Sequence, residues 1–419
     1  MSKNDLSTQS YKGVRDFYPD DMAVQQYIFD VWSQTAESFG FERYDASVLE
    51  PADLYRSKGA VNEEMVDEQT YTFTDRGDRE VTLRPEMTPT VARMIAGKRQ
   101  ELAFPVRWYS IPNLFRYERP QKGRLREHWQ LNCDIFGTDD YTADVEMIAL
   151  AYQMLLNFGA EPDMFEIRLN DRQEMGQLYQ EIGITDTEIQ TSLTRLNDRF
   201  HKLEEADYRG KLTEILSDVD QVNKVYNLVS GSNDDATNLV LNGLKELGIT
   251  NVVMDRSLAR GFDYYTGTIF EVFDISGENN RSMLGGGRYD DLTSLFGGES
   301  VSGIGFGMGD VTMRDFLDTH NLLTASLTAP QMMILPVESA QNLIAQKVAQ
   351  EFRTAGINIA VDMSDRKVGK KISAANNAFV EYVLIIGEDE AKGDTYVVKN
   401  LAEGSEMTGT LAELITQLT

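Results

Sequence analysis

Residues 115–137, FRYERPQKGRLREHWQLNCDIFG, combine side chains well suited to chemistry. They include five arginines or lysines, and apolar and polar residues alternate on both sides of the basic loop RPQKGR. This pattern predicts a β-hairpin, and because alternate residues of a strand share a face, Arg116, Glu118, Gln130 and Asp134 would line one patch of sheet. A planar cation, two carboxylates and an amide suit a ligand that carries both an ammonium group and phosphates.

A plainer interpretation is a surface hairpin with cross-strand ion pairs, each worth about 0.2–1 kcal/mol. Both interpretations expect Leu131, Cys133 and Ile135 to face the core from the return strand. They differ in whether the polar face meets a ligand. The hairpin alone favours the plainer interpretation, and the rest of the sequence changes that balance.

The charge of the chain restricts its partners. With a formal net charge of −27 over 419 residues, the mean field repels nucleic acid, so any RNA site needs a local basic cluster. Two clusters exist, one within residues 116–126 and one in DRKVGKK at 365–371. A single cysteine and three histidines exclude internal disulfides and make a Cys- or His-based metal centre improbable. With no signal-like or membrane-spanning apolar run, we expect a cytoplasmic protein with no membrane partner.

Hydrophobic spacing predicts the elements that must position these side chains. A helix is expected at 20–39, followed by a strand broken at Pro51. A strand ending near Arg84 precedes a helix that opens at residues 88–90. Strands at 106–118 and 128–136 form the basic hairpin.

Changes in sequence texture predict where the chain divides. Residues 171–245 are polar, helical in period and poor in strands, which indicates a helical insertion. Gly-rich, strand-like sequence returns at 251–311, and a linker is expected at 319–330. Beyond it, strands alternate with helices, as in a small α/β domain.

Several motifs, taken in order, resemble the class II aminoacyl-tRNA synthetases in their histidyl form. The basic hairpin resembles motif two of that class. GVRDFYPDD (13–21) resembles the family's N-terminal opening, and TLRPEMTP (82–89) resembles its histidine-binding loop. The two histidine-specific signatures are matched by RGFDYYTGTIFE (260–271) and GGGRYDDL (285–292). The likeness runs from about residue 11 to the C-terminus.

The resemblance implies an α+β fold with an antiparallel six-stranded catalytic sheet flanked by helices. We expect a catalytic domain at 1–170 and 246–325, interrupted by the helical insertion at 171–245. An anticodon-binding α/β domain would occupy 329–419. A homodimer built around helix 20–39 and the strand broken by Pro51 is also implied.

The implied activity is ATP-dependent formation of histidyl-adenylate from L-histidine, followed by transfer of the histidyl group to the 3′ end of tRNA(His). Arg116 and Arg260 match the family's catalytic arginines, which meet the α-phosphate and the histidine carboxylate. Two planar guanidinium groups suit these oxyanions better than lysines would. An ion pair of Arg260 with Asp263 or Asp255 is the structural alternative.

The resemblance also assigns the substrate-binding residues. Histidine would be held by Glu86, Thr88, Arg116, Gln130, Asp134, Arg260, Tyr264 and Tyr265. ATP would be held by Arg116, Glu118, which accepts from the adenine amino group, and Arg124, which meets the β- and γ-phosphates. Mg²⁺ should accompany ATP, held largely by phosphates and waters, and its protein ligands are not identified by the sequence.

Contacts with tRNA are expected from the two basic clusters. The loop of the hairpin would meet the acceptor end through Arg119, Lys122 and Arg126, with Arg124 nearby. The second cluster would meet the anticodon arm through Arg366, Lys367, Lys370 and Lys371. The alternative for the second cluster is a solvated lysine-rich helix face.

The sequence departs from the family at two positions. Asp134 stands where the residue that reads the imidazole ring is usually glutamate. Thr312 stands at about the position of the motif-three arginine that stacks on adenine, so either Arg314 or the main chain replaces that contact, or ATP binds less well.

Because of the second departure, the main alternative is a histidine-sensing paralogue that serves as the regulatory subunit of ATP phosphoribosyltransferase. That paralogue lacks the C-terminal anticodon-binding domain, whereas this sequence carries one. A threonine-specific synthetase is disfavoured by the Arg-Gly-x-Asp-Tyr-Tyr element at 260–265, and a plain α/β binding protein leaves the ordered motifs unexplained.

Overall fold

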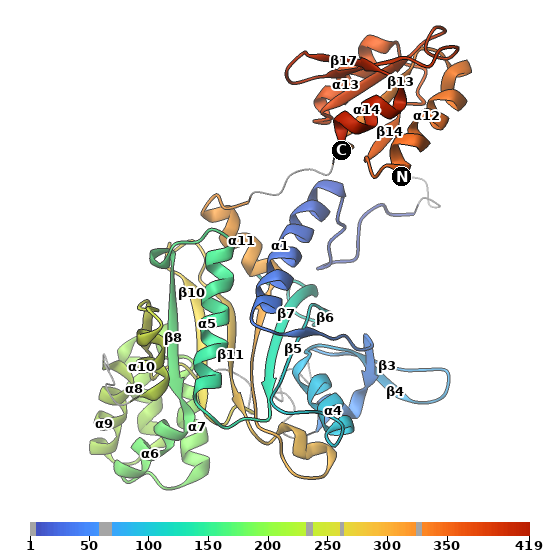
Figure 1. Ribbon diagram of the computed structural model, residues 1–419. Coiled ribbons are helices and arrows are strands. Elements are labelled where there is room, and N and C mark those ends of the chain that lie inside the picture. Colours follow the sequence, from blue (N-terminus) through green and yellow to red (C-terminus); the bar gives the residue numbers. More distant parts are fainter. Residues whose placement is uncertain (1–5, 58–68, 232–237, 260–263, 324–328) are drawn as a thin grey trace. The chain divides into compact units, whose positions relative to one another are not determined.

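The structure is a computed structural model that describes residues 6–57, 69–231, 238–259, 264–323 and 329–419 (Figure 1). The chain divides into two compact units. The first comprises Met1–Phe17 and Val24–Thr324, and the second comprises Tyr18–Ala23 and Ala325–Thr419. None of the helices in the described residues combines the length and hydrophobicity that a bilayer span requires.

A nine-stranded sheet organises the first unit. Its strands are, in spatial order, β1 (Glu42–Arg43), β5 (Val106–Ser110), β7 (Glu127–Phe136), β12 (Gly303–Gly309), β11 (Ser282–Tyr289), β10 (Thr268–Asp274), β8 (Phe165–Asp171) and β9 (Val252–Met254), with β6 (Asn113–Phe115) pairing with β7. The six strands from β5 to β8 are antiparallel to their neighbours, and β1 and β9 add parallel edges. The predicted six-stranded antiparallel core is therefore confirmed.

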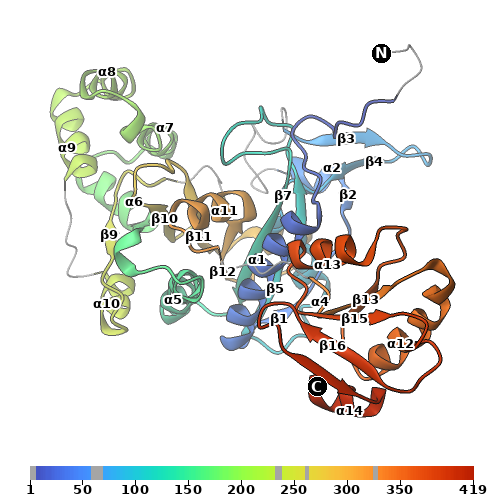
Figure 2. The ribbon, with the colours of Figure 1, turned by 90° about the horizontal axis from the view of Figure 1, so that it is seen from above.

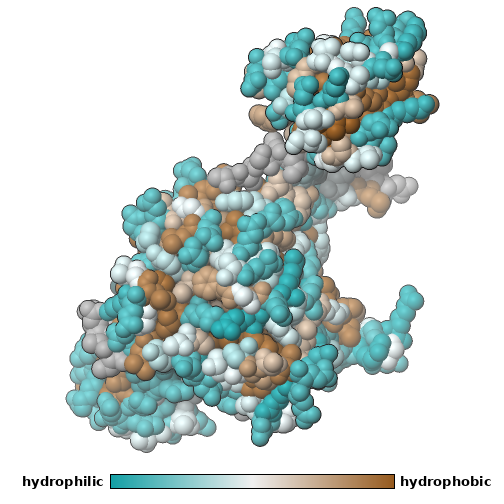
Figure 3. Space-filling view, viewed as in Figure 1, coloured by the Kyte–Doolittle hydropathy of each residue, from teal (hydrophilic) through white to brown (hydrophobic). Residues whose placement is uncertain are grey.

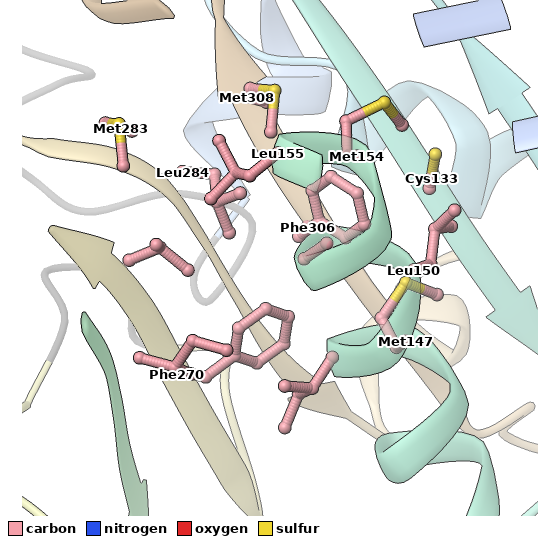
Figure 4. Close-up of a cluster of buried hydrophobic side chains, with 14 of the residues drawn as sticks. Cys133, Met147, Leu150, Met154, Leu155, Phe270, Met283, Leu284, Phe306 and Met308 are labelled. Carbon is pink, nitrogen blue, oxygen red and sulfur yellow. The ribbon is translucent and has the colours of Figure 1, made fainter. Parts of the chain in front are cut away.

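Helices cover one face of this sheet (Figure 1). They are α1 (Pro19–Ser38), α5 (Thr142–Asn157), α10 (Leu239–Glu246) and α11 (Asp310–Thr319). Their buried apolar residues share one cluster with the core-facing side chains of the strands. Figure 4 shows Met147, Leu150 and Met154 of α5 in this cluster with Phe306 of β12. The helix predicted at 20–39 is α1, and Gly40 follows it with φ +79°.

A smaller three-stranded sheet and its neighbouring helices also belong to the first unit. Its order is β2 (Leu49–Pro51), β4 (Glu80–Leu83) and β3 (Tyr71–Thr74), with α2 (Ala52–Arg56) following β2 directly. Helix α4 (Thr88–Lys98) begins where the sequence predicted it, with Pro89 in its first turn, where a missing N–H costs no helical hydrogen bond. The 3-10 helix η3 (Leu292–Phe296) lies near α4.

The helical segment predicted at 171–245 has two parts. Its first helices are α6 (Arg172–Glu181), α7 (Thr187–Asn197), η2 (Phe200–Lys202), α8 (Glu205–Ile215) and α9 (Val219–Ser230). They share their own apolar cluster, which includes Tyr179, Leu193 and Tyr208. Figure 2 shows α6–α9 grouped beside the β9 edge of the sheet, and their face in view in Figure 3 is mostly hydrophilic. Helix α10, at the end of the predicted segment, instead packs with α5 in the main core.

The second unit is an α/β domain. A five-stranded sheet has the order β14 (Ile359–Val361), β13 (Met332–Pro336), β15 (Tyr382–Ile386), β16 (Tyr396–Asn400) and β17 (Glu406–Gly409). Its helices are α12 (Asn342–Thr354), α13 (Val368–Asn377) and α14 (Leu411–Leu418). The β13–β14 and β13–β15 pairs are parallel, as the predicted alternation of strand and helix requires.

Candidate active site

Alternation along β7 gives the sheet one apolar and one polar face. Leu131, Cys133 and Ile135 are buried in the main core, as predicted. Gln130 and Asp134 therefore point to the opposite face, where β7 pairs with β12 in the register Gln130 to Gly309 and Asp134 to Gly305.

Glycines on β12 make room for those polar side chains. A Cβ atom at Gly305 would lie 2.1 Å from Asp134 Oδ1, and one at Gly307 would lie 2.2 Å from Gln130 Nε2. Both distances are impossible for real atoms. The side chains of Gln130 and Asp134 thus lie directly over the bare backbone of β12.

A cleft of about 1050 Å³ opens over this face, between the sheet and η2 of the helical segment. Four predicted site residues meet there, although they come from different parts of the hairpin: Arg116, Glu118, Arg124 and Gln130. The wall also includes His128, Arg168, His201, Asp255, Glu271, Arg281 and Thr312. The prediction that the hairpin lines a ligand site is compatible with this arrangement.

Two arginines of the cleft are held in place by different partners. Arg116 Nε donates to the Pro85 carbonyl oxygen at 2.8 Å, which fixes the guanidinium beside the loop before α4. Arg124 Nε lies 2.5 Å from Glu118 Oε2, and Glu118 is buried while Arg124 is half-exposed. The carboxylate expected to meet adenine is therefore paired with the arginine expected to meet phosphates.

The strand geometry predicted for residues 116–118 is wrong. The chain leaves the sheet at Phe115, the last residue of β6, and Glu118 N donates to the Arg116 carbonyl oxygen at 2.7 Å in a tight turn. Pro112, between β5 and β6, has no N–H with which to continue a strand. Arg116 and Glu118 still reach the same cleft, but through a turn rather than through alternation.

Beside the cleft, two buried carboxylates each accept a tyrosine hydroxyl. Tyr264 Oη donates to Glu86 Oε1 at 2.5 Å, and Tyr289 Oη donates to Asp134 Oδ1. The Tyr264 and Tyr289 rings pack edge to face, with centroids 5.7 Å apart. The Tyr265 ring packs against Tyr264 in a tilted arrangement, with centroids 4.7 Å apart. This cluster of aromatic and acidic side chains brings together residues from four separate motifs.

Burial controls the ionisation of Asp134. Loss of solvent raises its pKa to about 7, the Glu86 carboxylate adds to the rise, and the Tyr289 hydroxyl opposes it. An acid with this pKa changes charge near neutral pH. Asp134 can thus accept an N–H hydrogen bond as a carboxylate or donate one as an acid.

His128 is the neutral ring in the wall of the cleft. Burial lowers its pKa to about 3, and the cations Arg116, Arg15 and Arg124 lower it further. The imidazole is therefore uncharged at neutral pH, and the positive charge of the cleft wall comes from its arginines and Lys202.

Thr88 is the first residue of α4 and is half-buried beside Tyr264, on which its hydroxyl acts through a hydrogen bond. Its position next to Glu86 is compatible with the predicted role in holding an ammonium group. Arg260, predicted to be catalytic, lies outside the described residues, as does Asp263.

The loop residues predicted to contact RNA differ in their surroundings. Arg119 and Lys122 are exposed, and Lys122 Nζ donates to the Glu278 carbonyl oxygen at 3.2 Å. Arg126 is instead only partly exposed, because its guanidinium lies 4.0 Å from the Tyr117 ring centroid and donates to Tyr11 Oη at 3.1 Å. Arg126 thus ties the N-terminal segment to the hairpin.

The prediction that Lys371 contacts RNA is wrong. Only 2% of its surface is exposed, and its ammonium donates to the carbonyl oxygens of Pro336 at 2.9 Å and Asp362 at 3.0 Å. Helix α13 turns this side chain toward β13, so it cannot reach a phosphate. Lys367 and Lys370 remain exposed on the same helix end, and Arg366 pairs with Asp362 at 3.1 Å.

Sequence reasoning missed several residues of the site. It did not identify Tyr289 as the partner of Asp134, nor His128 and Arg281 as parts of the wall. The alternation of glycine at 303, 305, 307 and 309 is a period-two signal that could have indicated a strand with one bare face.

Asp310, two residues before Thr312, has a structural role. Its carboxylate accepts from Arg15 Nη2 at 2.6 Å, Gln25 Nε2 at 3.1 Å and the Trp129 N–H at 3.0 Å. Burial nevertheless raises its pKa, against the lowering effect of Arg15. This network joins the N-terminal motif, α1, β7 and α11, and so fixes the floor of the cleft.

No group of three or more His, Cys, Asp or Glu side chains in the described ranges is arranged to hold a metal ion. Within the cleft wall, Glu271 on β10 is a carboxylate from a strand, whereas Glu118 is paired with Arg124. Such a donor set fits a divalent cation that arrives with a phosphate ligand and keeps most of its waters.

Two family models match the chain. The model for histidyl-tRNA synthetase matches residues 13–310, and the model for an anticodon binding domain matches residues 331–419. The second match covers the α/β domain predicted from the sequence, which disfavours the regulatory paralogue.

Relatives match along the full chain. A histidine–tRNA ligase of Leptospira biflexa is 39% identical over 100% of this chain and 99% of its own, and one of Thermoplasma volcanium is 36% identical over 98% of both. The crystal structure of histidyl-tRNA synthetase from Nostoc sp. PCC 7120 superposes with a TM-score of 0.80 at 24% identity, covering 99% of this chain and 100% of that one. The chain belongs to the histidyl-tRNA synthetase family.

Proposed function

We propose that this chain activates L-histidine with ATP to form histidyl-adenylate and transfers the histidyl group to the 3′ end of tRNA(His). The observation that carries the proposal is the convergence of Arg116, Glu118, Arg124 and Gln130 on one cleft above a glycine-floored sheet. Membership of the histidyl-tRNA synthetase family supports the same reaction.

In the first step, the histidine carboxylate attacks the α-phosphorus of ATP and pyrophosphate leaves. Negative charge accumulates on the α-phosphoryl oxygens, so cations fixed in advance stabilise the transition state most. Arg116 is such a cation, because its Nε is held by the Pro85 carbonyl oxygen and its other nitrogens remain for oxyanions. Arg260 is proposed as its counterpart from the matched signature.

The cluster of aromatic and acidic side chains would select the amino acid. Glu86 and Thr88, with Gln130, would hold the α-ammonium group, and Asp134 would accept an N–H from the imidazole. Tyr264 and Tyr265 supply the aromatic walls. The shorter side chain of Asp134 is braced by Tyr289, which orients the carboxylate across Gly305.

The nucleotide would occupy the basic part of the cleft. Glu118 would accept from the adenine amino group, and Arg124 would move from Glu118 to the β- and γ-phosphates when ATP binds. Mg²⁺ is proposed to enter with the phosphates, held largely by them and by waters, with Glu271 of β10 as a candidate protein ligand in the cleft wall.

The remaining partners follow from exposed features. The acceptor end of tRNA(His) would meet Arg119, Lys122 and the neighbouring Arg126, and the anticodon arm would meet Arg366, Lys367 and Lys370. A homodimer is proposed through the region of α1 and β2, where Leu49 is 45% exposed. The cytoplasmic location expected from the sequence stays a prediction.

Histidine-dependent exchange of pyrophosphate into ATP tests the first step. We expect exchange with histidine and none with the other amino acids, followed by charging of tRNA(His). Histidine binding without exchange or charging would instead favour the regulatory paralogue.

A further inference from the structure

We propose that Arg281 takes the place of the motif-three arginine and stacks its guanidinium on the base of ATP. This inference rests on the proposed binding of ATP in the cleft. It identifies a residue that determines nucleotide affinity and that lies 31 positions before Thr312, outside motif three.

The location of Arg281 carries the inference. It directly precedes β11 and lines both the main cleft and an adjoining cavity of about 400 Å³. Thr312, at the start of α11, lines the same two spaces. A Cβ atom placed on Gly123, in the hairpin loop, would lie 2.8 Å from Arg281 Cδ and 3.6 Å from Thr312 Cγ2. The arginine side chain and the threonine methyl group thus both face the same loop glycine, at the departure from the family pattern.

The loop of the hairpin is shaped around this side chain. Gly123 has φ +73°, a conformation that favours glycine, and a Cβ atom there would lie 2.8 Å from Arg281 Cδ, so a side chain at position 123 would displace the arginine. The hairpin loop therefore closes over the aliphatic part of Arg281, which holds its position.

Arg281 is also available to a ligand. Among the residues that the structure describes, no carboxylate lies within ion-pair distance of its guanidinium, whereas Arg124 is paired with Glu118. Glu118 and Arg124 are nonetheless near enough to act on Arg281 electrostatically. The cation therefore lies beside the carboxylate that is proposed to read the adenine amino group.

Neither Arg314 nor the side chain of Thr312 itself is as well placed to meet the base. Arg314 does not line either cavity, and its Nε lies 4.0 Å from Asp318 on the following turn of α11. Thr312 Oγ1 donates to the carbonyl oxygens of Met283 and Gly309, both at 3.2 Å, so its hydroxyl is occupied by the main chain. Guanidinium groups stack well on purine faces, which makes Arg281 the suitable cation.

Calorimetric binding of ATP tests the proposal without depending on catalysis. We expect Arg281→Gln to weaken ATP binding roughly tenfold, the typical size of a partly desolvated cation–π contact. The matched control is Arg314→Gln, an arginine of the same region outside the cavities, which should bind ATP as the parent does. Equal ATP affinity in Arg281→Gln and the parent would overturn the proposal.

Two competitors separate a base contact from a phosphate contact. Arg281→Gln should weaken the binding of adenosine and leave the binding of inorganic tripolyphosphate unchanged. The reverse pattern would overturn the assignment to the base.

A compensating change gives a third readout. Adding Thr312→Arg to the Arg281→Gln protein should restore most of the ATP affinity, because it places a guanidinium beside the same space. If the parent binds ATP but shows no histidine-dependent exchange, the proposed function is wrong. The inference about Arg281 is still decided by these ATP affinities.

Discussion

The two basic clusters of this chain have similar charge density in the sequence, but their side chains have different surroundings in the structure. In the hairpin cluster, Arg116 and Arg124 line a cleft in positions set by a carbonyl oxygen and a carboxylate. In the C-terminal cluster, the side chain of Lys371 points from α13 into the domain and is buried, whereas Lys367 and Lys370 are exposed. Charge in the sequence therefore locates candidates, and the local backbone decides which of them can meet an anion.

The difference has a geometric cause. The hairpin loop has no regular period, so each cation takes the direction that its own contacts impose. The second cluster opens a helix, where residues three and four apart share a face but neighbours do not. Lys370 and Lys371 are adjacent and therefore diverge, one toward solvent and one toward the ends of β13 and β14.

The largest effect is expected from removing a fixed cation of the cleft. Arg116→Ala should lower the rate of adenylate formation roughly 10²–10³-fold, because one preorganised donor to the transition state is lost. Histidine-dependent pyrophosphate exchange measures the effect. The control Arg209→Ala removes a guanidinium held only within the helical segment, by Glu205 at 2.7 Å, and should leave exchange unchanged. Equal loss in both variants would remove the distinction between cleft and surface cations.

A structural cation should affect stability instead of exchange. Lys371→Ala should lower the unfolding free energy of the second unit by about 2–3 kcal/mol, because two buried carbonyl oxygens lose a charged donor. Urea unfolding monitored in the full chain by amide exchange of residues 331–419 reports this loss. The adjacent Lys370→Ala should change stability by less than about 0.5 kcal/mol. Equal stability of the two variants would contradict the structural role of Lys371.

Local patterns predicted elements better than they predicted contacts. Amphipathic spacing and Gly40 were enough for α1, and alternation was enough for the core face of β7. The break at Pro112 and the turn at Glu118 depend on how the hairpin meets the rest of the sheet, so alternation failed there.

Partners distant in the sequence were not predictable from it. The contact between Tyr289 and Asp134 spans 155 positions, and no local pattern encodes it. The inward direction of Lys371 depends on the phase of α13 relative to β13, which a short basic run does not specify. The order of the motifs carries long-range information that local patterns lack, and Arg116, Glu118, Arg124 and Gln130, which were chosen from it, line one cleft.

The carboxyl group of Asp134, proposed to bind histidine, titrates near neutral pH, whereas the arginines of the cleft stay charged. The pKa of Asp134 is raised to about 7, so its carboxylate is progressively protonated as the pH falls below that value. The KM for histidine should therefore rise up to about tenfold per pH unit below 7. Asp134→Asn should raise the KM at pH 8 and flatten this dependence between pH 6.5 and 8, above the range where free histidine itself titrates most. An unchanged pH profile would contradict the assignment of Asp134 to the imidazole.

Stability gives an independent measure of the same group. The native pKa of about 7 exceeds the ordinary value of 3.8, so the native state binds more protons than the unfolded state between these limits. The contribution of Asp134 to stability is therefore lost as the pH rises through this window. Asp134→Asn should remove that part of the pH dependence of the unfolding free energy, and a steeper dependence in the variant would contradict the raised pKa.

The smallest effect is expected from the exposed half of the C-terminal cluster. Lys367 and Lys370 lie at the start of α13 with no ion pair among the residues that the structure describes. If they meet phosphates of the anticodon arm, replacing both with glutamine should raise the KM for tRNA(His) a few-fold. The slope of log affinity against log salt concentration should fall by roughly one unit per lost contact. Pyrophosphate exchange should stay unchanged, because these side chains belong to the second unit.

A matched control separates a specific contact from general charge. Lys392 and Lys399 are exposed lysines of the same unit, paired with Glu388 at 3.3 Å and Glu406 at 3.4 Å. The double glutamine variant at these positions changes the net charge equally but should leave the salt slope as in the parent. Equal slopes in the two double variants would mean that α13 offers only a solvated lysine face, since a general charge effect is shared by both. A difference in slope, with Lys371 intact in each, would assign the RNA contact to the exposed lysines of α13.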